Sequence, residues 1–69
     1  MTFGEKLQKL RARAGMSQDA LAERLNVSRQ AVSRWERDDG APDLSVIPVI
    51  AEIFDITCDE LLRGERKSP

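Results

Sequence analysis

Apolar residues recur every three or four positions along this chain, which is the spacing of helices with one buried face. The positions that we expect to face a common core are Phe3, Leu7, Leu10, Ala14, Leu21, Ala22, Leu25, Val32, Trp35 or Glu36, Leu44, Ile47, Ile50, Ala51 and Phe54. No segment alternates apolar and polar residues for long enough to indicate a strand. The pattern therefore predicts an all-α fold.

Capping residues predict where these helices begin and end. The expected N-caps share a side-chain hydroxyl that can accept from a backbone N–H of the first turn, and they are Thr2, Ser17, Ser28, Ser45 and Thr57. Glu5 and Glu60 each follow a threonine by three residues and complete capping boxes. Gly15 and Asn26 suit the left-handed residue after a helix, and Pro48 suits a first turn. The predicted helices cover roughly 3–14, 18–25, 29–37, 46–54 and a last short segment through Leu61 and Leu62.

The second and third predicted helices are joined by only about three residues, Asn26-Val27-Ser28. A connection this short forces the helices to cross steeply, as in a helix-turn-helix. Ala22 is small enough to let the two helices approach closely at the crossing. With Val32 facing inward, positions 29, 30, 33 and 34 share the outer face of the third helix.

Size and composition restrict the function classes. The chain has 69 residues and 7.8 kDa, which predicts one small domain over 1–63 and a polar tail or linker over 64–69. It has no histidine and a single cysteine, Cys58, so the sequence predicts no disulfide, metal site, cofactor or enzymatic activity. Without an apolar run of about 18–20 residues or a secretory signal, the chain is expected to be soluble and cytoplasmic.

The distribution of charge is informative although its sum is small. The net charge of −1 by itself argues against a nucleic-acid partner. Residues 1–37, however, carry eight basic and four acidic residues, a charge of +4, whereas residues 38–69 carry three basic and eight acidic residues, a charge of −5. Such asymmetry is typical of a protein of which one face meets a polyanion.

The segment from Ser17 to Arg37 resembles the DNA-binding domains of the Xre family, which includes the phage Cro and CI repressors. Pro42-Asp43-Leu44 and the segment from Ile56 to Leu62 are similar to that family's fourth-helix entry and last helix. The resemblance implies a lambda-repressor-like fold of five short helices, with the third in the major groove of double-stranded DNA. It further implies a bacterial or phage transcriptional regulator, expected to be a nucleoid-associated repressor that binds a palindromic operator as a homodimer.

The resemblance also assigns candidate site residues. Those expected to contact bases are Arg29, Gln30, Ser33 and Arg34. Arginine can donate two hydrogen bonds to guanine, and glutamine can bind adenine in the same bidentate way. The residues expected to contact phosphates are Gln18, Ser28 and Arg37. Arg11 and Glu36 match family positions that form a structural salt bridge between the first and third helices.

Simpler interpretations remain open for several of these residues. Arg29 and Arg34 are also compatible with plain solvated charges, and Gln18 with a polar residue of a first turn. Ser28 is expected to act first as an N-cap. Trp35 is expected to pack on the domain rather than stack on bases, and Cys58 to be a small apolar residue rather than a redox group.

The acidic second half supports an alternative function. Asp38, Asp39 and Asp43 stand in a loop where the family often has neutral or basic residues, which weakens the expectation of phosphate contacts there. The alternative is a protein-interaction module on the same fold, such as an antitoxin or adaptor, with its partner bound through loop 38–43 and the last helix.

Overall fold

A computed structural model describes residues 1–63, and over these residues the chain forms helices without a strand. The five helices are α1 (Phe3–Arg13), α2 (Gln18–Leu25), α3 (Arg29–Glu36), α4 (Ile47–Ile53) and α5 (Cys58–Arg63). The all-α prediction is confirmed, and the predicted bounds are correct to within one residue for the first four helices. The proposed tail, 64–69, lies outside the described residues.

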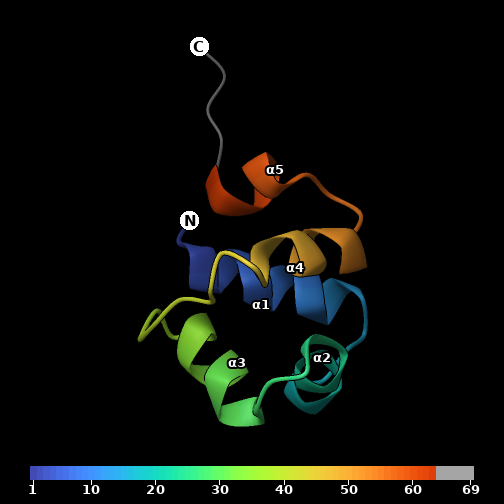
Figure 1. The fold of residues 1–69 in the computed structure, drawn as a ribbon, viewed down its shortest axis with the longest axis vertical. Coiled ribbons are helices and arrows are strands. Elements are labelled where there is room, and N and C mark those ends of the chain that lie inside the picture. The colour runs from blue at the N-terminus through green and yellow to red at the C-terminus, as the bar shows by residue number, and fades with distance from the viewer. Residues whose placement is uncertain (64–69) are drawn as a thin grey trace.

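The helices lie around α1. Figure 1 shows α2 and α3 on one side of α1 and α5 on the other, and α4 packs against α5. The apolar side chains buried between them are Leu7, Leu21, Ala22, Leu25, Val32, Trp35, Ile47, Ile50, Ala51 and Leu61. Phe3, Leu10 and Phe54 pack against this core. None of the helices within residues 1–63 has the length and apolar character needed to cross a bilayer.

Two residues predicted to face the core are exposed instead. Ala14 is the residue after the last turn of α1, where its side chain has passed the buried face. Leu44 lies in the turn before α4 and is 83% exposed. In both cases the apolar stripe extends one step beyond the helix, because α1 ends at Arg13 and α4 begins only at Ile47.

Local capping signals determine most helix ends. Thr2 and Glu5 form the predicted capping box at α1, and Ser17 Oγ accepts from the backbone N–H of Ala20 at the start of α2. Thr57 and Glu60 form the second predicted capping box, before α5. Gly15 (φ 71°) and Asn26 (φ 60°) adopt the predicted left-handed conformation.

The predicted cap at Ser45 is wrong. The N-cap of α4 is Val46, whose backbone is already helical (φ −87°, ψ −26°) and which makes no side-chain capping bond. The Val46 N–H donates to the Asp43 carbonyl at 2.9 Å, so the chain winds from a turn directly into the helix. A side-chain cap needs an N-cap residue with an extended backbone, and Ser45 does not occupy the N-cap position. Pro48 does lie in the first turn, as predicted.

The N-terminus of α1 is fixed against the C-terminus of α3. A Cβ at Gly4 would lie 2.6 Å from the carbonyl oxygens of both Trp35 and Glu36, so only glycine permits this approach. The Asp38 carboxylate accepts from the Gly4 N–H at 3.0 Å and from the Thr2 hydroxyl at 2.7 Å. Asp38 therefore caps α1 from the loop that follows α3.

Candidate nucleic-acid interface

The corner between α2 and α3 is built from a left-handed residue and a serine cap. After Asn26, the Val27 N–H donates to the Ala22 carbonyl at 3.0 Å and closes α2. Ser28 Oγ then accepts from the Ala31 N–H at 3.1 Å and begins α3, which confirms the capping role of Ser28. Ala22 is buried at this corner, so the predicted helix-turn-helix is present.

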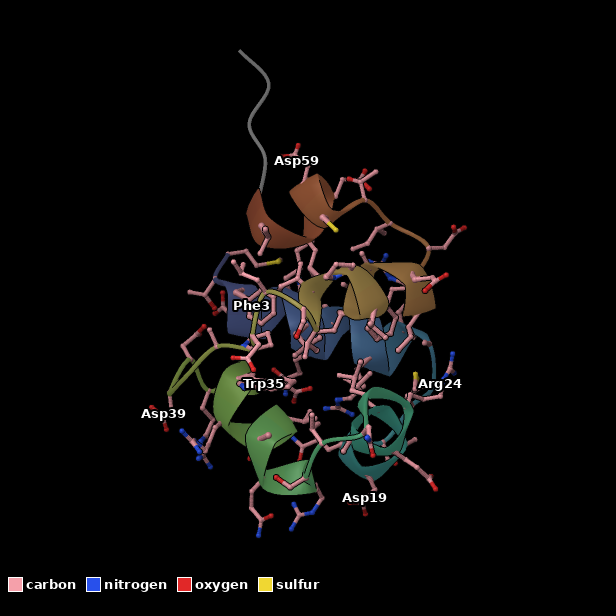
Figure 2. All side chains as sticks on the ribbon, viewed as in Figure 1. Phe3, Asp19, Arg24, Trp35, Asp39 and Asp59 are labelled. Carbon is pink, nitrogen blue, oxygen red and sulfur yellow. The ribbon has the colours of Figure 1, made fainter. Side chains whose placement is uncertain are left out.

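The third helix has one buried and one exposed face. Val32, Trp35 and Glu36 are buried, and the sequence expectation that Trp35 packs on the domain is therefore confirmed. Arg29, Gln30 and Arg34 are exposed, whereas Ser33 is half-buried. Figure 2 shows nitrogen-bearing side chains that extend from the outer side of α3, away from α1. This helix thus presents a polar face of arginine and amide groups to the surroundings.

The orientation of α3 is held by a buried polar network. Arg11 of α1 donates to the Glu36 carboxylate through Nε (2.6 Å) and Nη2 (3.1 Å). The Arg11 and Glu36 side chains are only 15% and 4% exposed, so the pair is largely removed from water. The salt bridge that the resemblance implied is present in the structure.

The environment of Arg11 favours its charged form. The hydrogen bond to Glu36, more than the direct charge attraction, raises the pKa of Arg11 above its ordinary value, against the opposing effect of burial. Because the pKa is raised, this contribution to stability is complete below the pKa of an unfolded arginine and is lost only at more basic pH. Arg11 also donates to the Met16 carbonyl at 2.8 Å, which ties the network to the link between α1 and α2.

Gln18, a predicted phosphate contact, is part of this network. Its Nε2 donates to Glu36 Oε1 at 2.9 Å, so α1, α2 and α3 meet on one carboxylate. The side-chain oxygen and the second N–H of the amide are not required for that bond. Sequence reasoning missed this contact because no local spacing relates positions 18 and 36.

Two predicted DNA-contact arginines have acidic neighbours that the sequence analysis did not pair with them. Arg29 Nε lies 3.4 Å from Asp19 Oδ1, and Arg37 Nε lies 3.4 Å from Asp39 Oδ2. All four side chains are more than half exposed, so these ion pairs exchange readily with water and contribute little to stability. The structure brings an acid to each end of α3.

Cys58 is a free, exposed thiol at the first residue of α5. Within residues 1–63, no three His, Cys, Asp or Glu side chains are grouped so as to hold a metal ion.

Comparisons with known proteins agree with this geometry. A family profile described as "Helix-turn-helix" matches residues 7–61. The transcriptional activator BcrR of Enterococcus faecalis is 48% identical over 94% of this chain and 32% of its own length. YgzD of Bacillus subtilis, an uncharacterized HTH-type transcriptional regulator, is 36% identical over 91% of this chain and 96% of its own length.

A solved structure with the same fold is that of the P22 c2 repressor in complex with a synthetic operator. It superposes with a TM-score of 0.87 and 28% identity, over 94% of this chain and 98% of the repressor chain. This chain spans about a third of the length of BcrR and just over half that of two Bacillus subtilis regulators that it also matches. By sequence and fold, the chain belongs to the helix-turn-helix family of the Xre or Cro/CI type.

Proposed function

We propose that this domain regulates transcription by binding double-stranded DNA in a sequence-specific way, with α3 in the major groove. The observation that carries the proposal is the outer face of α3, where Arg29, Gln30 and Arg34 are exposed on a helix whose other face is locked into the core. The operator complex of the P22 c2 repressor, which has the same fold, supports it.

The proposed base contacts come from the first two turns of α3. Arg29 and Gln30 begin the helix and carry the donors suited to guanine and adenine. Arg34 lies one turn further along the same face, and the half-buried Ser33 can reach only a base edge that comes close to the helix. Each bidentate contact of this kind discriminates against a wrong base by about 1–3 kcal/mol.

The proposed phosphate contacts flank this face. Gln18 stands at the start of α2, where free backbone N–H groups and the helix dipole favour an anion, and Glu36 holds its amide in place. Ser28 can offer its hydroxyl proton to a phosphate while its oxygen continues to cap α3. Arg37 would exchange Asp39 for a phosphate oxygen.

The assembly and the regulatory outcome follow from the same proposal. One domain offers few phosphate contacts, so we infer a homodimer that binds a palindromic operator, with two α3 helices about 34 Å apart. Such a protein acts in the cytoplasm at the nucleoid, without enzymatic activity. We infer repression, because the P22 c2 protein, which has the same fold, is a repressor. Activation is the alternative, because BcrR is an activator. A reporter gene fused to the bound promoter distinguishes these outcomes by whether expression rises or falls when the protein is removed.

The alternative of a protein-interaction module finds less support. It relies on the acidic loop 38–43 and the last helix, but within the loop Asp38 caps α1 and Asp39 is paired with Arg37. Two of the three acids in that loop are therefore engaged within the chain.

Selection of bound duplexes from a random DNA pool tests the proposed function. We expect a palindromic consensus, and an affinity for the selected duplex that falls steeply with salt because phosphate contacts release counterions. Absence of any enriched sequence, or binding that does not respond to salt, would contradict the proposal.

A further inference from the structure

The pair between Asp19 and Arg29 joins the starts of the two helices that form the corner. Asp19 is the second residue of α2, and Arg29 is the first residue of α3. Their side chains are 79% and 54% exposed, and Arg29 Nε lies 3.4 Å from Asp19 Oδ1. Figure 2 shows Asp19 at the end of the domain formed by α2 and α3, far from α5. The acid thus lies at the proposed DNA-facing end.

Helix electrostatics explain why this arginine has an acidic neighbour. The start of a helix carries a partial positive charge, which disfavours a cation at Arg29 and favours an anion at Asp19. The carboxylate compensates for the unfavourable position of the guanidinium. Since an exposed ion pair contributes little to folding, the main consequence of the pair concerns what Arg29 does at the surface.

The contacting atom limits how Arg29 can bind. The approach of Asp19 is at Nε, which leaves the end of the guanidinium formed by Nη1 and Nη2 for an incoming pair of acceptors. Guanine presents such a pair, O6 and N7, in the major groove. A phosphate that approached Arg29 from the Nε side would instead meet the like charge of the Asp19 carboxylate.

We propose that Asp19 is a specificity-determining positioning residue, which directs Arg29 toward guanine in the major groove and opposes its use as a general phosphate ligand. This inference rests on the proposed function, because it assigns Arg29 to a base. Loss of the Asp19 charge then weakens base discrimination while it strengthens binding to unrelated DNA.

The pair at the other end of α3 provides a matched control. Asp39 also lies 3.4 Å from an arginine Nε and is similarly exposed, but its partner, Arg37, is the C-cap of α3 and a proposed phosphate contact. Asp39→Asn removes the same charge as Asp19→Asn. It should raise the affinity for all sequences alike and leave base preference unchanged.

The test uses the duplex selected by the wild-type chain. The Arg29→Ala variant first identifies the guanine that Arg29 contacts, because replacement of that guanine by adenine no longer changes the affinity of this variant. Fluorescence anisotropy then gives dissociation constants for three duplexes: the guanine duplex, the adenine duplex and an unrelated one. The proteins compared are the wild type, Asp19→Asn, Asp39→Asn, Arg29→Ala and the double variant Asp19→Asn with Arg29→Ala. Circular dichroism verifies that each variant is folded.

We expect the wild type to prefer the guanine duplex by about 10-fold or more, which is the low to middle range for a bidentate contact. Asp19→Asn should reduce this preference to a few-fold and tighten binding to the unrelated duplex, whereas it should not alter base preference in the Arg29→Ala background. Retention of the full guanine preference in Asp19→Asn, or an equal loss in Asp39→Asn, would overturn the inference while DNA binding stands. If the wild type selects no sequence, the proposed function and this inference fall together.

Discussion

The contacts that join α1, α2 and α3 differ in kind from those that hold α4 and α5. Among the first three helices, Arg11, Gln18 and Glu36 form a buried polar network, and Asp38 caps α1 from beyond α3. The packing of α4 and α5 is mainly apolar, through side chains such as Ile50 and Leu61. Directional bonds fix an angle, whereas apolar burial tolerates small rotations. The half that carries the proposed DNA-reading helix is therefore the half whose geometry is fixed by hydrogen bonds.

Removal of the Glu36 carboxylate, at the centre of the polar network, should cause the largest loss of stability. Glu36→Ala leaves Arg11 charged and largely buried without a partner, and we expect a loss of about 3–5 kcal/mol in the free energy of unfolding. Urea denaturation measures it. Because the pKa of Arg11 is raised above its already strongly basic ordinary value, the loss should be the same at pH 6 and pH 9.

A paired replacement controls for this prediction. Arg11→Met combined with Glu36→Leu exchanges both charges for apolar groups, which often costs little or even stabilises. The double variant should recover more than half of the free energy of unfolding that Glu36→Ala loses. A single-variant effect under about 1 kcal/mol would show that water already solvates the pair.

Leu61→Ala examines the apolar half. Leu61 is fully buried on α5, so its truncation should cost about 2–5 kcal/mol in the free energy of unfolding. Thermal denaturation measures the loss. After correction for the unfolded fraction, this variant should bind the selected duplex as tightly as the wild type, whereas folded Glu36→Ala should bind more weakly because Gln18 loses its support. Equal binding defects in the two variants would remove the functional distinction between the halves.

Gly4→Ala tests the close approach of α1 to α3. The added Cβ would lie 2.6 Å from two backbone carbonyl oxygens, which cannot move without displacing α3, and we expect a loss of about 1–3 kcal/mol. Gly40→Ala is the matched control, because its Cβ would meet only Arg34 Nη2 at an ordinary 3.6 Å. Urea denaturation of the two variants should differ clearly, and similar values would argue against the contact.

Asp38→Ala should have the smallest effect on stability. It removes the acceptor of the Gly4 N–H, while Thr2 still accepts from the Glu5 N–H, so a loss of about 1 kcal/mol is expected. Asp38→Asn keeps an acceptor and a residue that tolerates φ of 60°, and it should lose less. The melting temperatures of the two variants test this prediction. An equal decrease for Asp38→Asn and Asp38→Ala would contradict it.

Local signals in the sequence were sufficient to predict most of the fold. Caps such as Ser17 and left-handed residues such as Asn26 act within a few positions of where they stand, so their effects can be predicted from neighbouring residues. The predicted cap at Ser45 was wrong because the conformation of the turn backbone, rather than the Ser45 side chain, determines where α4 begins.

The polar contacts of the candidate site were harder to predict. Gln18 meets Glu36, and Asp38 meets Gly4, across 18 and 34 positions of the chain, and no periodicity relates such residues. The pair of Arg11 and Glu36 came from the family resemblance, not from spacing. The exposed face of α3 could be predicted because helical periodicity assigns it once Val32 is placed in the core.

The exposed face of α3 is proposed to bind the DNA bases, and an affinity comparison among surface variants separates this face from the rest of the domain. The dissociation constant for the selected duplex is measured for the wild type, for Arg29→Ala with Gln30→Ala, and for Arg24→Ala. Arg24 is an exposed basic residue near Val49 and Glu52 of α4, and Figure 2 shows it on the side of the domain away from α3. We predict that the double variant, with an unchanged circular dichroism spectrum, binds about 100-fold or more weakly, and that Arg24→Ala stays within a few-fold of the wild type. Equal affinities for all three proteins would show that α3 does not bind the DNA bases.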